Sequence, residues 1–187
     1  LPLTDIQIPG VHNIENYMAA IAAVDGIVPD KCVRAVAQRF TGVEHRIELV
    51  RELDGVRYYN DSIGTSPTRT MACLDSFDQK LILIAGGYDK GVPFTQLGVE
   101  IVRQVKALIL TGDTAPAIKK AVEEAEGYIE SGLQLIETED LATAVSAARE
   151  IAREGDVVVL SPACAAFDRF KNFMERGKVF KQLVNDL

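Results

Sequence analysis

The sequence predicts an α/β fold with a Rossmann-like, mostly parallel sheet that carries helices on both faces. Three short apolar runs, LILIA at 81–85, ALIL at 107–110 and VVVL at 157–160, lack alternation between polar and apolar residues. Strands that are buried on both faces have this composition, and they belong to parallel sheets covered by helices. Segments with helical periodicity separate these runs, which is the order of elements that builds such a sheet.

The first forty residues predict a smaller, mostly helical unit. We expect a short strand at Asp5–Ile8, a turn at Pro9-Gly10, and helices over His12–Val24 and Pro29–Phe40. A proline such as Pro29 is favoured at the start of a helix. Thr41-Gly42 breaks the pattern, so we predict a domain boundary there, with one unit at 1–41 and a second at 42–187.

The second unit is expected to open with a hairpin, because Asp54-Gly55 is a strong two-residue turn signal. Ser66-Pro67 combines a capping residue with a first-turn proline and therefore marks the start of the next helix. The predicted strands are Arg46–Leu53, Val56–Tyr59, Leu81–Ala85, Ala107–Thr111, Gln134–Ile136 and Val157–Ser161. The predicted helices are Ser66–Ser76, Phe94–Gln104, Ala115–Glu126, Leu141–Arg153 and Phe170–Val184.

Composition excludes several classes of protein. The chain has 187 residues, 48% of them hydrophobic, so wholesale disorder is excluded. A net charge of −7 disfavours a general nucleic-acid binder, which needs clustered Lys and Arg. No apolar run approaches the roughly 20 residues of a membrane helix, so we expect no membrane partner.

The cysteines indicate a reducing, cytoplasmic compartment. Cys32, Cys73 and Cys164 are scattered and odd in number, which argues against a disulfide framework, and with two histidines they make a zinc site improbable. No basic region followed by an apolar stretch, as in a signal peptide, is visible at the start. The chain opens at Leu1 without a methionine, which suggests a piece of something longer or an omitted leader.

Ligands of open parallel sheets bind beyond the carboxyl ends of the strands. The residues that follow the predicted strands are small or polar: Asn60-Asp61-Ser62, Gly86 to Gly91, Gly112-Asp113, and Ser161-Pro162-Ala163-Cys164. Asp61 is suited to accept from ribose hydroxyls or, alternatively, to cap the next helix. Lys90 offers a point charge to a carboxylate or phosphate, or it is a solvated lysine in a tight turn. We interpret Cys164 as a small buried thiol rather than a nucleophile.

Two further polar motifs lie near the domain boundary. Asn13 and Asn16 are three residues apart, hence on one face of a helix, where their amides can read an adenine edge. Alternatively, Asn13 is an N-terminal cap. Arg46 follows the boundary and can meet a phosphate, or it is a surface charge.

Five longer phrases of the sequence are informative together: GVHNIENYMAA at 10–20, FTGVEHRIE at 40–48, YNDSIGTSPTRT at 59–70, GGYDKG at 86–91 and SPACAAFDRFKNFMERG at 161–177. In this order they resemble the Mur ligases of peptidoglycan synthesis, and in particular the members that add D-glutamate. The resemblance covers essentially the whole chain. It implies a parent of three domains, of which this chain carries the helical tail of the central ATPase domain and the whole C-terminal domain.

The resemblance also implies an amide ligation. In the reaction that the resemblance implies, ATP phosphorylates the carboxylate of UDP-MurNAc-L-Ala, the amine of D-glutamate attacks the acyl phosphate, and phosphate leaves from the tetrahedral intermediate. The family's phosphate loop, G-x-x-G-K-[ST], is absent from this chain. The triphosphate grip, the Mg ligands and the UDP site are therefore expected in the N-terminal and central domains of the parent, with no metal ligands here.

Roles follow residue by residue from the same resemblance. The expected nucleotide contacts are Asn13 and Asn16 on the adenine side, with Arg46 and Asp61 at phosphate and ribose. Thr65 and Lys90 are expected to hold the side-chain carboxylate of D-glutamate, and Ala166, Phe167 and Phe173 to lie around its α-carboxylate. His45 and Lys90 are the catalytic candidates, with no role assigned to His45.

Two departures affect this assignment. Ile63 stands where some relatives have lysine, and Ala166 where a serine is often found. The main alternative is a stand-alone, non-catalytic module that binds an acidic amino acid or a nucleotide. A nicotinamide dehydrogenase lacks support without G-x-G-x-x-G, and a folate-polyglutamating ligase is disfavoured by the ending K-N-F-x-x-R-G at 171–177.

Overall fold

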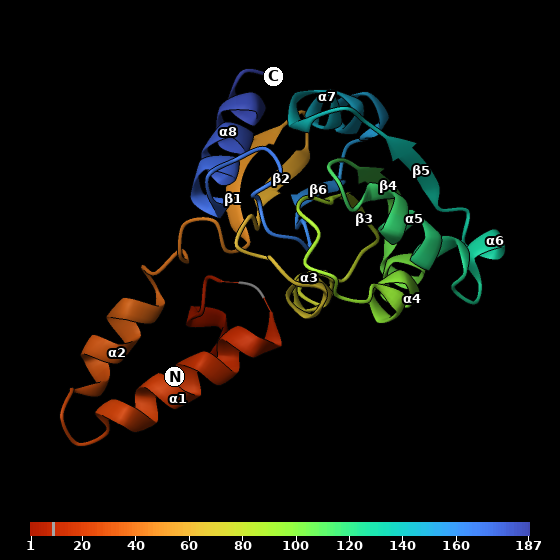
Figure 1. Cartoon of the computed structure of the whole chain (residues 1–187). Coiled ribbons are helices and arrows are strands. Elements are labelled where there is room, and N and C mark those ends of the chain that lie inside the picture. Colours follow the sequence, from red (N-terminus) through yellow and green to blue (C-terminus); the bar gives the residue numbers. More distant parts are fainter. Residues whose placement is uncertain (9) are drawn as a thin grey trace.

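The computed structural model of the chain describes residues 1–8 and 10–187. Figure 1 shows a pair of helices at the N-terminal end beside a larger unit built around a sheet. The strands are β1 (Glu48–Leu53), β2 (Val56–Asn60), β3 (Leu81–Ala85), β4 (Val105–Leu110), β5 (Gln134–Glu137) and β6 (Val157–Leu160). They form one six-stranded sheet in the order β1-β2-β6-β3-β4-β5.

The sheet is parallel except at one edge, where β1 pairs antiparallel with β2. The predicted hairpin joins these two strands. Asp54 has φ 52° and Gly55 has φ 74°, and two successive residues with positive φ are what the favoured two-residue hairpin turn requires. The predicted fold class, a mostly parallel α/β sheet, is confirmed.

Helices cover both faces of the sheet (Figure 1). One face carries α3 (Pro67–Leu74), α4 (Thr95–Gln104) and α5 (Ala115–Glu123), with the short α6 (Tyr128–Ser131) beyond them. The other face carries α7 (Leu141–Ile151) and α8 (Phe173–Asn185). Along β3, Leu83 packs into the first layer while Ile82 and Ile84 pack into the second, since successive side chains of a strand point to opposite faces.

The N-terminal unit consists of a 3-10 turn (Leu3–Asp5), α1 (Val11–Val24) and α2 (Asp30–Ala37). The two helices confirm the sequence prediction, but the strand predicted at Asp5–Ile8 is wrong. That segment has no neighbouring strand to pair with, and Asp5 instead pairs with Arg34 of α2 at 3.0 Å and accepts from Gln38 at 3.0 Å. Pro9 of the predicted turn lies outside the described residues. The division of the chain at residue 41 stays a prediction.

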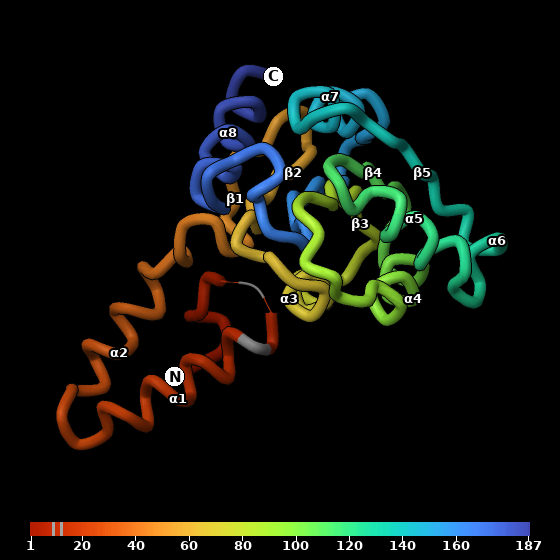
Figure 2. The backbone as a smooth tube through the Cα atoms, viewed as in Figure 1, coloured from red at the N-terminus to blue at the C-terminus, as the bar shows by residue number. Residues whose placement is uncertain are grey.

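Two long connections meet at the carboxyl ends of the strands (Figure 2). The Tyr88 N–H after β3 donates to the Ala165 carbonyl after β6 at 3.0 Å, and these residues form an isolated bridge. Gly86 N–H donates to the Pro162 carbonyl at 2.9 Å. The helix predicted from Phe170 begins at Phe173, because Asn172 caps it by accepting from Glu175 N–H at 2.9 Å.

Candidate functional site

The carboxyl ends of β2, β3 and β6 bring the predicted motifs together. Gly86 and Gly87 follow β3 with φ of 116° and 149°. A Cβ at Gly86 would fall onto the Thr111 carbonyl, and one at Gly87 would fall onto the Ala165 carbonyl. Both positions therefore need glycine, because no side chain fits between the adjoining backbones.

Asp61 lies directly after β2 and is buried, with 4% of its surface exposed. Its Oδ2 accepts from Ser161 Oγ at 2.7 Å, and its Oδ1 accepts from Ile47 N–H at 3.3 Å. Burial raises the pKa of this carboxyl from 3.8 to about 6, and these hydrogen bonds lower it in part. The N-cap of α3 is Ser66, so the alternative reading of Asp61 as the cap is wrong.

Lys90 and Thr65 lie together, as the resemblance implied for two residues of one carboxylate site. Lys90 Nζ donates to the Thr65 carbonyl at 2.9 Å across two different connections of the sheet. Lys90 is exposed, so its ammonium group is accessible to a ligand from outside.

The other residues expected around the amino acid separate into two places. Ala166 is buried and Phe167 is exposed; the Phe167 ring meets Tyr88 edge to face, with centroids 6.1 Å apart. Phe173 instead lies beside His45, with centroids 6.0 Å apart. The structure thus places Phe173 with His45 rather than with the Tyr88–Phe167 pair.

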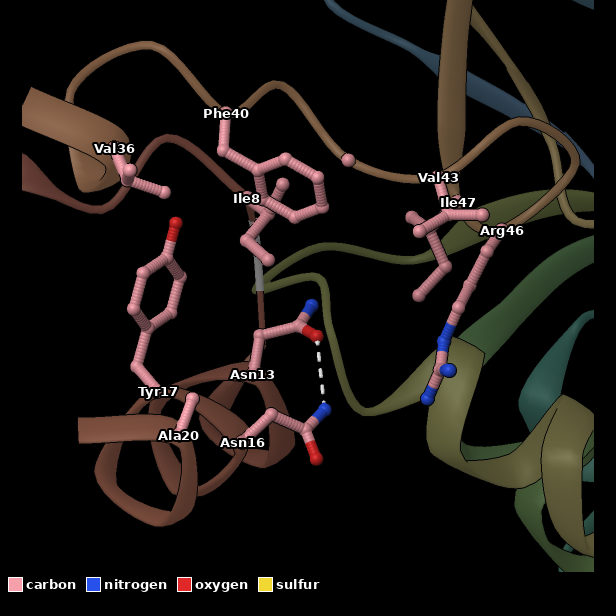
Figure 3. A pocket seen from close by; sticks show the side chains of 11 residues that line it. Ile8, Asn13, Asn16, Tyr17, Ala20, Val36, Phe40, Val43, Arg46 and Ile47 are labelled. Atoms are coloured by element: carbon pink, nitrogen blue, oxygen red, sulfur yellow. Dashed lines mark hydrogen bonds between the residues drawn. The ribbon is translucent and has the colours of Figure 1, made fainter. Parts of the chain in front are cut away.

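A cavity of about 320 Å³ lies between the helical pair and the start of the sheet domain. Figure 3 shows the Asn13 and Asn16 amides side by side and Arg46 across from them, and Asn16 Nδ2 donates to Asn13 Oδ1 at 3.3 Å. The rest of the wall is mainly apolar: Ile8, Tyr17, Ala20, Val36, Phe40, Gly42, Val43 and Ile47. Asn13 is not a cap, because α1 begins at Val11 with Gly10 as its N-cap.

A second cavity of about 170 Å³ adjoins the first, since Arg46 and Ile47 line both. Asp61, Gly64 and Arg69 contribute its polar and backbone wall, together with Cys73. Ile63 also lines it, so this wall is apolar at that point. The arrangement places one buried carboxylate and two guanidinium groups beside a small space.

Sequence reasoning missed Arg176, which is 4% exposed and binds the connection after β2 to the connection after β6. Its Nε and Nη2 donate to Ser62 Oγ and the Ser62 carbonyl at 3.1 and 2.9 Å. Its Nη2 and Nη1 also donate to the Cys164 and Ala165 carbonyls at 3.0 and 3.1 Å. Burial lowers the pKa of Arg176 to about 10. Arg176, Phe180 and Val184 share one buried helix face, and an arginine on such a face was the available signal.

Cys164 and the acidic group near the boundary fit structural roles. Cys164 is a buried free thiol whose pKa burial raises to about 11, as expected for an inert cysteine. Within residues 1–8 and 10–187, Glu44, His45 and Glu48 bring three potential metal ligands within 4.8 Å of one another. Lys181 Nζ already pairs with Glu48 at 2.6 Å and Glu44 at 3.1 Å, so an ammonium group occupies the carboxylate side of this cluster. None of the helices in the described part of the chain is long and apolar enough to cross a bilayer.

Known proteins resemble the chain over nearly its whole length. It is 54% identical to the UDP-N-acetylmuramoylalanine–D-glutamate ligase of Acetivibrio thermocellus and 51% identical to that of Clostridium beijerinckii. Each match covers 98% of this chain but 40% of the relative, so the chain spans about two fifths of their length.

The fold is shared more widely. A folylpolyglutamate synthase of Mycobacterium tuberculosis, solved with ADP, superposes with a TM-score of 0.68 at 14% identity, over 95% of this chain and 41% of that one. The family described as Mur ligase, glutamate ligase domain, matches residues 45–164. The chain therefore belongs to the Mur ligase family and carries its glutamate ligase domain.

Proposed function

We propose that this chain is the amino-acid-binding part of an ATP-dependent ligase that joins D-glutamate to UDP-N-acetylmuramoyl-L-alanine in peptidoglycan precursor synthesis. One observation carries the proposal: about half of the residues are identical, over nearly the whole chain, to ligases that are named for this reaction. Below, the complete ligase means the longer protein of which we propose this chain is a part.

The amino-acid side of the site is assigned to the edge of the sheet. D-Glutamate differs from most amino acids by its second carboxylate, so a ligase must recognise that group. Lys90, whose ammonium group donates to the Thr65 carbonyl, supplies a positive charge there. Among the described residues no carboxylate forms an ion pair with Lys90, so its charge is available to a ligand. Ala166 has no hydroxyl, so we assign recognition of the α-carboxylate to backbone N–H groups or water near the 166–167 turn.

The nucleotide side is assigned to the two adjoining cavities. The larger one reaches the range of about 300–1,000 Å³ that is typical of small-molecule sites, and it pairs apolar walls with two amides. A purine base has that same combination of apolar faces and a polar edge. Arg46 would then meet phosphate, and Asp61, as a carboxylate, retains free lone pairs for ribose hydroxyls.

The chemistry that this assignment leaves to the chain is positioning. ATP activates the acceptor carboxylate in the complete ligase, and we propose no ligand for its Mg ion among the residues of this chain. Lys90 and Thr65 hold the D-glutamate nucleophile, while Asn13, Asn16 and Arg46 hold the nucleotide. Fixing two reactants in the right orientation supplies a large part of the rate of such a ligation.

The preceding domains of the complete ligase also explain the surface of the helical pair. Val11, Met18 and Ile27 are exposed there, and we propose that those domains cover them. The substrates are precursors made inside the cell, so we place the ligase in the cytoplasm.

The test is substrate-dependent release of phosphate by the complete ligase. We expect turnover with ATP, UDP-N-acetylmuramoyl-L-alanine and D-glutamate, and little with L-glutamate or D-aspartate in its place. Turnover that is independent of the amino acid, or that prefers another one, would refute the proposed substrate.

The absence of a phosphate loop from the sequence favours a second possibility for the chain alone, a binding module without catalysis. We expect the isolated chain to fold, to hydrolyse no ATP above a buffer blank, and to bind ATP weakly in a calorimetric titration. Low-micromolar affinity for ATP would mean that the nucleotide site is not shared between domains.

A further inference from the structure

Two residues in the segment that joins the helical pair to the sheet adopt a conformation that is unusual for their type. His45 has φ 67° and Ile47 has φ 46°, in the left-handed region. Bulky L-residues occupy that region at a cost, and for a β-branched isoleucine it is a true outlier. Arg46 lies between them, and it is the residue that lines both cavities of the proposed nucleotide site together with Ile47.

The His45 side chain holds this turn from the sheet side. It is 3% exposed and lies against Gly177 of α8, where a Cβ would overlap the imidazole ring. Nδ1 is 2.9 Å from Asn60 Nδ2, and an amide nitrogen can only donate, so Nδ1 accepts and the proton of the neutral ring is on Nε2. Burial lowers the pKa of His45, which keeps the ring neutral.

Backbone hydrogen bonds hold the turn on both sides of Arg46. His45 N–H donates to Glu48 Oε2 at 2.9 Å, and the His45 carbonyl accepts from Ile63 N–H at 3.2 Å. On the other side, Ile47 N–H donates to Asp61. The residues flanking Arg46 are thus fixed to the sheet domain, while Arg46 itself extends into the open space seen in Figure 3.

We propose that His45 is a positioning residue: its buried imidazole holds the strained turn that keeps the Arg46 guanidinium at the boundary of the two cavities. It performs no proton transfer, because the ring lines neither cavity and its Nδ1 is engaged by Asn60. This inference rests on the proposed function, in which Arg46 meets the nucleotide. The benefit is preorganisation, since a fixed backbone reduces the cost of ordering a long side chain on binding.

The test is a double-mutant cycle in the complete ligase, with KM for ATP, KM for D-glutamate and kcat measured for each variant. Arg46→Ala should raise the KM for ATP about tenfold or more, and His45→Ala should raise it by a similar order. Neither should change the KM for D-glutamate by more than about twofold. In the double variant the KM for ATP should match that of Arg46→Ala, because His45 acts through the arginine.

Two further variants separate the anchor from the backbone strain and guard against misfolding. His45→Gly accepts the left-handed conformation but loses the anchor, so its KM for ATP should rise as in His45→Ala. His45→Asn tolerates the same conformation and retains an acceptor for Asn60, so it should restore part of the loss. Arg153→Ala, an exposed arginine before β6 at the other end of the strands, is the matched control.

Several outcomes would overturn the inference while leaving the proposed function intact. The first is a KM for ATP that rises in Arg46→Ala but not in His45→Ala. The second is a double variant in which the two increases in the KM for ATP multiply. The third is a His45→Ala variant whose KM for ATP is unchanged but whose kcat falls and whose pH profile loses one limb. By contrast, an Arg46→Ala variant with an unchanged KM for ATP would refute the nucleotide assignment itself.

Discussion

The helical pair and the sheet domain are stabilised in different ways. In the sheet domain, two layers of buried side chains enclose the strands, and residues such as Leu83 and Ile84 are fully buried. Before residue 42, Ala37 is the one apolar side chain found buried among the described residues, whereas Val11 is 70% exposed and Met18 66% exposed. The sheet domain therefore has a core of its own, and the helical pair has little.

This difference in packing matches the proposed assignment of the amino acid to the sheet domain and of the adenine to the helical pair. The groups assigned to D-glutamate, Lys90 and Thr65, lie in connections that leave the buried strands of the sheet domain. The amides assigned to adenine, Asn13 and Asn16, are on the helix with the weaker support. A site that is divided between a stable domain and a dependent one suits a ligase that closes over its nucleotide.

The largest expected contrast is between two arginines, one in each region. Arg176→Ala should lower the free energy of unfolding by about 3–5 kcal/mol, because several buried acceptors lose their donor at about 1–3 kcal/mol each. Arg34→Ala should cost less than about 1 kcal/mol, because its ion pair with Asp5 is largely exposed on the arginine side. Urea denaturation of the isolated chain measures both.

Arg176→Lys serves as the control for charge. It keeps a cation but not the fork of donors that reaches Ser62, Cys164 and Ala165, so it should recover only part of the loss. Equal losses for Arg176→Ala and Arg34→Ala would break the contrast between the two regions.

A second prediction concerns the pH dependence of the sheet domain through Asp61. Its pKa is raised from 3.8 to about 6 in the folded chain. The folded state thus binds this proton more tightly than the unfolded state does. The contribution of the protonated Asp61 carboxyl to stability is therefore complete below the unfolded pKa and is lost as pH rises through about 6. The difference corresponds to about 3 kcal/mol.

The stability of Asp61→Asn relative to the unsubstituted chain should therefore rise between about pH 4 and about pH 6 and stay constant above that, as measured by denaturation at each pH. Asp140→Asn is a control of opposite sign, because hydrogen bonds from Thr143 lower the pKa of Asp140. Asp140→Asn should be less stable than the unsubstituted chain above the unfolded pKa of Asp140, and this loss of stability should vanish as pH falls. A flat pH dependence for Asp61→Asn would show that this carboxyl is not desolvated.

The smallest effect again compares the two regions, through two tyrosine hydroxyls. Those of Tyr17 and Tyr58 are covered and have no hydrogen-bond partner among residues 1–8 and 10–187. Tyr58 is fully buried in β2, whereas Tyr17 is only half-buried. Tyr58→Phe should stabilise the chain by about 1 kcal/mol and Tyr17→Phe by less than about 0.5 kcal/mol. Thermal denaturation that ranks them in reverse would contradict the difference in burial.

Most of the sheet domain could be predicted from the sequence, because β3, β4 and β6 contain uninterrupted apolar runs and the β1–β2 hairpin has the dipeptide that its turn demands. The N-terminal strand could not. Polar and apolar residues alternate in Asp5–Ile8 as in a strand, but a strand also needs a neighbouring strand to pair with. Asp5 instead forms a tertiary ion pair with Arg34 of α2. The short helix α6 between Gly127 and Gly132 has no periodicity long enough to detect.

The candidate site was predictable only where a motif follows a strand. Lys90 and Thr65 were expected to lie together and do, 25 residues apart in sequence. The roles of Arg176 and of the His45 turn depend on contacts between distant segments, such as that of His45 with Gly177, which no local pattern encodes.

The most direct test of the account is a crossed kinetic measurement on the complete ligase. Lys90→Ala should reduce kcat/KM for D-glutamate about ten- to a hundredfold and change the KM for ATP much less. Arg46→Ala should do the opposite, and Lys80→Ala, just before β3, should leave both unchanged. If Lys90→Ala instead weakened ATP binding and spared D-glutamate, the assignment of the amino acid to the sheet edge would be wrong.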